Sequence, residues 1–136
     1  MSRAVAALLL IGAGVLVCWA YWDQHWPATY TAGKRAHHDG VYYYVYLRSL
    51  GFDGDIDFAN DYQLLENPWQ SPVNARTGRF ENMFGIGTAL AWSPMLAIAR
   101  LVYPSQNGAS EDFQWLVYFA SALYGFAATV LMYLTA

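Results

Sequence analysis

A carboxylate close to a run of tyrosines is the first feature of this sequence that could do chemistry. In the stretch "HHDGVYYYVYLRSL", Asp39 comes three residues before three adjacent tyrosines. On a helix that starts at Asp39, the side chains on one side, at spacings of three and four, are Tyr42, Tyr43, Tyr46 and Leu50. A carboxylate at the mouth of such an aromatic, water-poor surface can serve as a general base. Asp39 is therefore the candidate catalytic residue.

A purely structural role for Asp39 is also open. An aspartate before a glycine at the start of a helix is an ordinary N-cap, whose carboxylate accepts backbone N–H groups of the first turn. A cap that also faces a cavity could do both. The sequence leaves both roles standing.

Three alternating aspartates follow in "DGDIDFAND" and suggest a site for a divalent metal ion. Asp53, Asp55 and Asp57 could bring their oxygens together around a hard cation. The stretch fails the EF-hand pattern, because Phe58 stands where the loop needs glycine and Leu64 where it needs glutamate. The alternative is turn and cap chemistry, in which these side chains bond their own backbone.

The composition indicates that a membrane protein positions these residues. Of 136 residues, 57% are hydrophobic and 12% are charged, where soluble proteins average about 25% charged. No basic run could neutralise a series of phosphates, so nucleic acid is excluded as a partner. The lone Cys18 lies in an apolar segment and forms no internal disulfide.

Two apolar segments are long enough to cross a bilayer, 4–22 and 113–136. A signal peptide is the alternative for the first, but it ends in "CWAYWDQHW", which is bulky where a peptidase needs small side chains. No polar or basic flank follows the second segment. We therefore expect the chain to be the beginning of a longer polytopic protein, cut inside or just after this helix.

The segment between the two spans is predicted to face outward. Arg3 indicates a cytoplasmic N-terminus, residues 1–3, which places the loop 23–112 on the extracytoplasmic side. Juxtamembrane helices are expected at about 40–50 and 84–103. For the second of these, a short kinked span is the alternative. The predicted fold class is all-α integral membrane, with two transmembrane helices flanking a long outward loop with juxtamembrane helices.

Three motifs in this order, "DGVYYYVYLRSL", "FDGDIDFAND" and "TGRFENMFGIGTALAWSP", carry a resemblance. Between about residues 37 and 94 the chain looks like the N-terminal part of a GT-C superfamily membrane glycosyltransferase, the group that includes protein mannosyltransferases and aminoarabinose transferases. The resemblance implies transfer of a sugar, with inversion, from a polyprenyl-phosphate carrier to an acceptor on the outer face of a bacterial-type inner or plasma membrane.

The resemblance also implies roles for single residues. Asp39 matches by position the acid of the family's first outward loop and would deprotonate or orient the acceptor hydroxyl. The commoner family pattern has a second acid next to it, where this chain has Gly40. The departing lipid phosphate would need a cation. The residues implied in substrate binding are Tyr42, Tyr43, Lys34, Arg35, Arg76 and Arg79, while Asp53, Asp55 and Asp57 would bind the sugar or a divalent ion that bridges the phosphate.

A different class of protein remains open. The chain could be a small two-span membrane protein whose acidic and aromatic outward loop binds a partner or a divalent ion. The sequence distinguishes neither the sugar nor the class of acceptor.

Overall fold

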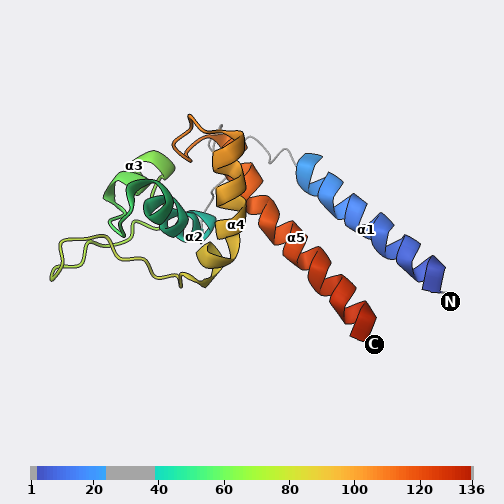
Figure 1. Ribbon diagram of the computed structural model, residues 1–136. Helices are drawn as coiled ribbons and strands as arrows, with labels where there is room; N and C mark the ends of the chain where they lie inside the picture. The colour runs from blue at the N-terminus through green and yellow to red at the C-terminus, as the bar shows by residue number, and fades with distance from the viewer. Residues whose placement is uncertain (1–2, 24–38, 136) are drawn as a thin grey trace.

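The computed structural model of the protein describes residues 3–23 and 39–135, and these ranges are mostly helical (Figure 1). The described residues contain no strand beyond an isolated antiparallel bridge between Val73 and Phe80. The predicted all-helical class is therefore confirmed. The elements are α1 (Arg3–Asp23), α2 (Asp39–Arg48), the π-helical turn η1 (Ser49–Asp53), α3 (Ala59–Leu65), α4 (Gly87–Val102) and α5 (Glu111–Thr135).

Helix α5 is long and apolar enough to cross a membrane. Its 25 residues extend about 37 Å at 1.5 Å per residue, which exceeds the roughly 30 Å of a hydrocarbon core. Its first turns are buried down to Ala120, whereas large side chains near its end, such as Leu131 and Met132, are exposed. Among the described residues it is the one helix that meets the length and hydropathy of a span.

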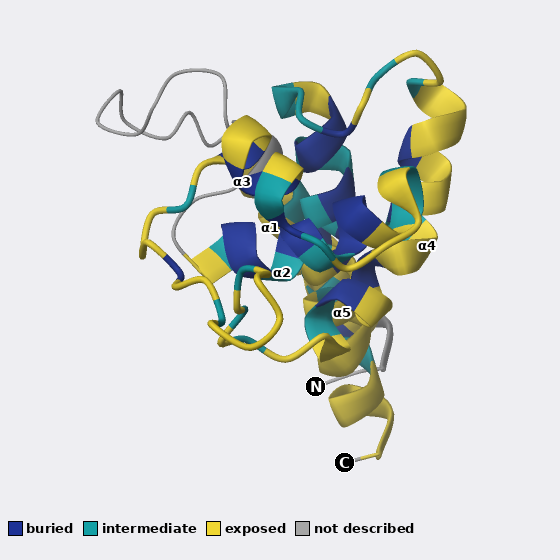
Figure 2. Cartoon of the chain, turned by 90° about the vertical axis from the view of Figure 1, so that its left-hand side faces the viewer, coloured by how far each residue is buried: buried dark blue, intermediate teal, exposed yellow. Residues whose placement is uncertain are grey.

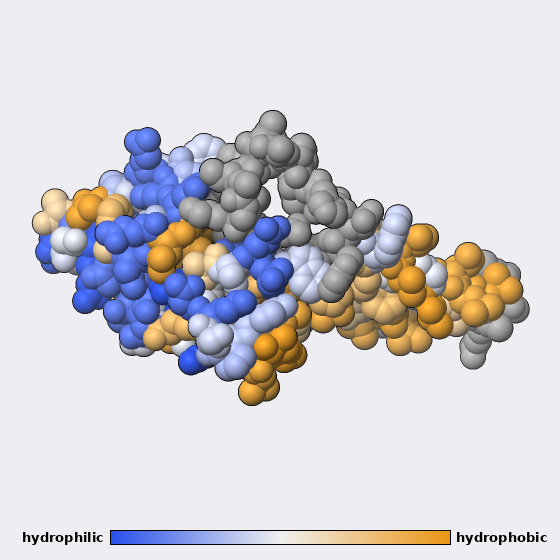
Figure 3. Space-filling model, turned by 90° about the horizontal axis from the view of Figure 1, so that it is seen from above, coloured by the Kyte–Doolittle hydropathy of each residue, from blue (hydrophilic) through white to orange (hydrophobic). Residues whose placement is uncertain are grey.

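Helix α1 packs beside the second half of α5, and the two lie side by side in Figure 1. A Cβ added at Gly14 would lie 2.4 Å from the ring of Phe126, so the absence of a side chain permits the approach. The described apolar part of α1, Val5–Ala20, is shorter than a full span. Two transmembrane helices therefore stay a prediction. Figure 3 shows hydrophobic surface toward the α1 and α5 end and hydrophilic surface over the other end.

Helix α2 lies at the centre of the buried core (Figure 2). Its ten residues start with Asp39 and end with Arg48, charges that complement the helix dipole. Apolar and aromatic side chains surround the helix, and Val41, Tyr44 and Val45 are almost completely buried. The core around α2 is completed by α3, α4 and the first turns of α5. The start of α2 is thereby held firmly in place.

The α2 helix continues into a π-helical turn that the sequence analysis did not predict. The turn ends at Gly54, whose φ of 75° is in the left-handed region and whose N–H donates to the Ser49 carbonyl at 2.8 Å. Inside the turn, Gly51 lies against α4, and a Cβ there would meet the Leu96 side chain at 2.6 Å. This close contact fixes the end of α2 on α4.

Helix α4 runs alongside α5 in the region where a juxtamembrane helix is expected. The Trp92 indole donates to Ser121 Oγ at 2.9 Å, and the Tyr124 hydroxyl donates to the Ala91 carbonyl at 2.6 Å. Pro94 lies inside the helix rather than breaking it. The outer face of α4 is apolar and exposed, with Leu101 the most exposed residue there. An interfacial position in the membrane stays a prediction.

Candidate functional site

Asp39 is the first residue of α2 and is exposed to solvent. Its Oδ1 accepts a hydrogen bond from the Trp69 indole Nε1 at 3.0 Å. Within residues 39–135, no backbone N–H of α2 donates to this carboxylate. The described contacts therefore tie Asp39 to a distant part of the chain instead of capping its own helix.

Trp69 is held in place through Tyr42, which is fully buried in the next turn of α2. The Trp69 backbone N–H donates to the Tyr42 hydroxyl oxygen at 2.7 Å. The same hydroxyl donates to Asn67 Oδ1 at 2.7 Å, and this oxygen also accepts the Ser71 backbone N–H at 2.9 Å. A hydrogen-bonded chain thus runs from Asn67 through Tyr42 and Trp69 to Asp39.

The turn that carries Trp69 has a strained backbone. Glu66 and Gln70 have φ values of 78° and 49°, and they are the non-glycine residues with positive φ in the described chain. Such conformations cost about 1–3 kcal/mol each and persist when the surroundings impose them. Here the surroundings are the bonds to Tyr42 and the Gln70 N–H bond to the Asn67 carbonyl at 3.0 Å.

The first turn of α2 is also tied to α5 and to the segment before α4. The Tyr118 hydroxyl, on α5, donates to the Gly40 carbonyl at 3.2 Å. Asn82 Nδ2 donates to the Tyr42 carbonyl at 2.7 Å. Tyr43, which is half-buried, packs edge-on against Phe84 with ring centroids 5.0 Å apart. Asp39 therefore stands at the edge of a packed aromatic surface, which includes the buried Tyr44, whereas Leu50 of the predicted face is exposed.

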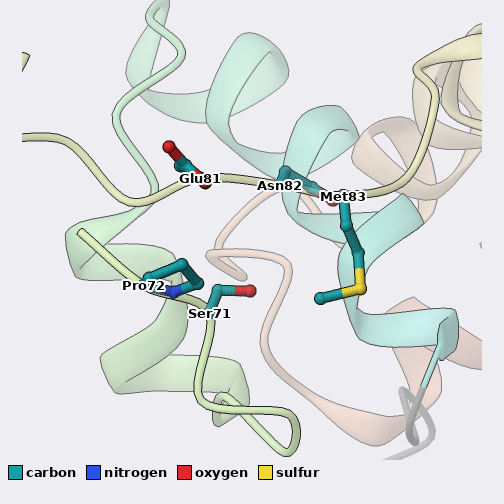
Figure 4. A pocket seen from close by; sticks show the side chains of 5 residues that line it. All are labelled: Ser71, Pro72, Glu81, Asn82 and Met83. Atoms are coloured by element: carbon teal, nitrogen blue, oxygen red, sulfur yellow. The ribbon is translucent and has the colours of Figure 1, made fainter. Parts of the chain in front are cut away.

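A cavity of about 380 Å³ opens between the segment after Trp69 and the segment before α4 (Figure 4). Figure 4 shows the Ser71 and Met83 side chains pointing toward each other across it. Two residues of the cavity wall also bond to residues that hold Trp69 and Asp39 in place. The Ser71 backbone N–H donates to Asn67 Oδ1, and Asn82 Nδ2 donates to the Tyr42 carbonyl. The lining residues are Ser71, Pro72, Glu81, Asn82 and Met83.

A buried charge cluster holds the other end of α2. Arg48 Nη1 contacts Asp61 Oδ1 at 2.6 Å and Asp53 Oδ2 at 2.7 Å, and its Nε donates to the Asn107 carbonyl at 3.1 Å. Asp61 is fully buried, and burial raises the pKa of its carboxyl while Arg48 opposes the rise. Burial disfavours the charged Arg48, but the two carboxylates outweigh burial and raise the Arg48 pKa. The cluster joins α2, α3 and the 107–110 segment.

Each of the three alternating aspartates has its own partner. Asp53 binds Arg48 and also Asn60 Nδ2, at 2.8 Å. Asp55 accepts from the Asp57 backbone N–H and from Ser49 Oγ, and the first of these bonds is the main cause of its lowered pKa. The described residues contain no group of three His, Cys, Asp or Glu side chains placed to hold a metal ion. The role of the three aspartates with a metal or a sugar stays a prediction.

The predicted cations are placed only in part. Lys34 and Arg35 lie outside the described residues. Arg76 and Arg79 belong to the exposed loop before α4. Arg79 Nε lies 3.9 Å from Asp57 Oδ2. Neither arginine contacts Asp39 in the described part of the chain. Their predicted role in phosphate binding is untested by this arrangement, as is the predicted substrate contact of Tyr42 and Tyr43.

Sequence reasoning missed Trp69 and the Arg48–Asp61 pair. Trp69 lies 30 residues from its partner Asp39, and Arg48 lies 13 residues from Asp61. Neither separation leaves a local pattern. The one available signal was an aromatic residue after the "ENP" stretch, which is typical of a turn.

Comparison with known proteins identifies no relative. No protein-family model matches the chain, and neither curated protein sequences nor solved structures give a match.

Proposed function

We propose that this chain forms the N-terminal membrane and catalytic-loop portion of a glycosyltransferase. The enzyme moves a sugar from a polyprenyl-phosphate carrier to an acceptor on the outer face of the membrane. The observation that carries the proposal is the placement of Asp39, an exposed carboxylate at the start of α2, anchored beside the candidate spanning helix α5. The resemblance of the loop motifs to the GT-C superfamily supports the same reaction.

The level of Asp39 along α5 supports a substrate that arrives from the bilayer. Tyr118, which bonds to Gly40, lies seven residues after Glu111 at the start of α5, or about 10 Å along the helix. Exposed apolar side chains begin within the next two turns, at Leu123. A lipid-linked sugar held along α5 and an acceptor from the water phase would meet at this level.

In this reaction Asp39 acts as the general base. Its Oδ1 is bound by the Trp69 indole, and Oδ2 has no hydrogen bond within the described residues. Oδ2 would accept the proton of the acceptor hydroxyl as that oxygen bonds to the anomeric carbon. The bond from the anomeric carbon to the carrier's phosphate oxygen breaks, and its electron pair leaves with the lipid phosphate. Attack opposite the leaving group inverts the anomeric centre.

The membrane arrangement that goes with this function has α1 and α5 as two spans and the loop 23–112 outside. The packing of α1 on α5 at Gly14 and the exposed apolar side chains of both helices support it. The apolar outer face of α4 would then lie against the membrane surface. The cationic side chains for the phosphate would come from Lys34, Arg35, Arg76 and Arg79.

The test is sugar transfer by membranes that contain the full-length protein. Radiolabelled polyprenyl-phosphate sugars are offered to the wild type, to Asp39→Asn and to Asp112→Asn. Loss of a general base lowers transfer by about 10²- to 10⁴-fold, so we expect Asp39→Asn to lose nearly all activity at normal protein level. Asp112 is an exposed carboxylate on α5, and its substitution controls for a lost negative charge. Wild-type transfer by Asp39→Asn would refute the base assignment.

A second candidate function is binding of a partner by the outward loop. Large apolar side chains of this loop are exposed, with Trp69 at 54% and Met83 at 66%, and such side chains are common at protein interfaces. This alternative gains if no polyprenyl-phosphate sugar serves as a donor for the wild-type protein.

A further inference from the structure

We infer that Trp69 is the positioning residue of the reaction, whose indole N–H fixes the orientation of the Asp39 carboxylate. The inference rests on the proposed function, because it assigns Trp69 a role through Asp39. It adds a residue that no motif of the sequence singles out.

Trp69 is not placed by complete burial of its ring. Tryptophan is placed in most proteins by burying its large ring, but Trp69 is 54% exposed. Its indole donates a directed bond, from Nε1 to Asp39 Oδ1 at 3.0 Å. The indole N–H is a donor only. It can orient a carboxylate and cannot take the proton that the carboxylate removes.

The turn around Trp69 holds the residue in place. The backbone N–H of Trp69 bonds to the fully buried Tyr42 hydroxyl, which is in turn fixed by Asn67. On either side of Trp69, Glu66 and Gln70 adopt positive φ. Such backbone strain persists where the surrounding contacts impose it, and here these contacts hold the indole within hydrogen-bond distance of Asp39 at the start of α2.

The two oxygens of the Asp39 carboxylate would have different roles. The indole holds Oδ1, which stops rotation of the carboxylate about its Cβ–Cγ bond and directs Oδ2 to one place. A base must lie within hydrogen-bond reach of the proton it removes. A misplacement of about 1 Å can cost roughly 100-fold in rate. Loss of the indole bond therefore lowers the rate of the chemical step and leaves binding of the lipid-linked donor in place.

The experiment measures kcat and KM for transfer from polyprenyl-phosphate sugars in membranes with the full-length protein. Trp69→Phe keeps an aromatic ring and removes the N–H donor. We expect kcat to fall about 10- to 100-fold, while KM for the donor stays within about twofold of wild type. Protein level and protease protection of the loop show whether Trp69→Phe folds.

The matched control is Trp92→Phe, which also removes one indole hydrogen bond, the one to Ser121 Oγ. Trp92 is buried between α4 and α5. Its substitution is expected to lower thermal stability and to leave kcat near the wild-type value. A general loss of tryptophan packing would lower kcat in both variants, and that result would overturn the positioning role of Trp69.

A double variant separates action through Asp39 from independent action. If Trp69 works through the carboxylate, Trp69→Phe causes no further fall in residual transfer when Asp39 is already asparagine. An equal fall in both backgrounds would overturn the inference. So would a rise in KM with unchanged kcat, because Trp69 would then bind substrate itself.

The two proposals fail in different ways. If Asp39→Asn abolishes transfer and Trp69→Phe keeps wild-type kcat, only the role of Trp69 is wrong. If both variants keep wild-type kcat, the base assignment and the inference built on it fall together.

Discussion

At the scale of single residues, polar groups are buried near both ends of α2. The neighbours of each group determine its protonation state. Tyr62 is an example, because its hydroxyl is buried against α2 and faces Ser71. Burial raises the pKa of Tyr62 to about 12, an effect that Ser71 opposes. The phenol is thus kept protonated at neutral pH, and its ring packs edge-on against Tyr42 with centroids 5.7 Å apart.

A pH dependence follows from the Tyr62 shift. Because the folded protein holds the phenol proton more tightly than the unfolded chain, this contribution is fully present below pH 10 and is lost as pH rises through about 12. We expect thermal stability to fall over that window, and Tyr62→Phe to make the fall shallower. Unfolding followed by circular dichroism between pH 8 and about 12 measures it. An identical slope in the variant would assign the alkaline loss to other groups, of which buried Tyr44 is the first candidate.

At the scale of elements, the lengths of α2 and α4 follow from local sequence, but the way they meet does not. An acid at the start, a basic residue at the end and continuous apolar content predict α2 from residues 39–50 alone. The π-helical turn and α3 were missed because Asp and Gly residues suggest only a turn there. Tertiary packing determines how the end of α2 meets α4. Leu96 of α4 lies so close to Gly51 that an added Cβ would be 2.6 Å from its Cδ2.

The contact between Gly51 and Leu96 leads to a prediction about the packing of the end of α2 on α4. Gly51→Ala would place a methyl group 2.6 Å from Leu96 Cδ2, and such overpacking costs about 1–3 kcal/mol. We expect a lower midpoint of thermal unfolding in detergent. Gly125→Ala on α5 is the matched control, because nothing lies within 4 Å of its added Cβ and alanine favours a helix. A midpoint for Gly51→Ala at or above that of the control would show that the Leu96 side chain moves aside at little cost.

At the scale of the whole molecule, apolar runs were enough to predict a helical protein, while the role of Asp39 stays a prediction. They could not predict what orients Asp39, because the contact with Trp69 joins residues 30 apart through a strained turn. The Arg48–Asp61 pair escaped for the same reason. Pairings at such separations depend on how helices pack, whereas periodicity reports only which side of one helix is apolar.

The arrangement of the whole chain across the membrane leads to the last prediction. If α1 and α5 are both spans, the N-terminus and the loop between α4 and α5 lie on opposite sides, and the orientation predicted from Arg3 puts the N-terminus inside and the loop outside. We expect a cysteine introduced at Ser105, in a Cys18→Ser background, to react in intact cells with a maleimide that cannot cross membranes. A cysteine at Ser2 should react only after the cells are permeabilised. Reaction of both in intact cells would mean that α1 does not cross, and Asp39 would then have to meet its lipid donor along α5 alone.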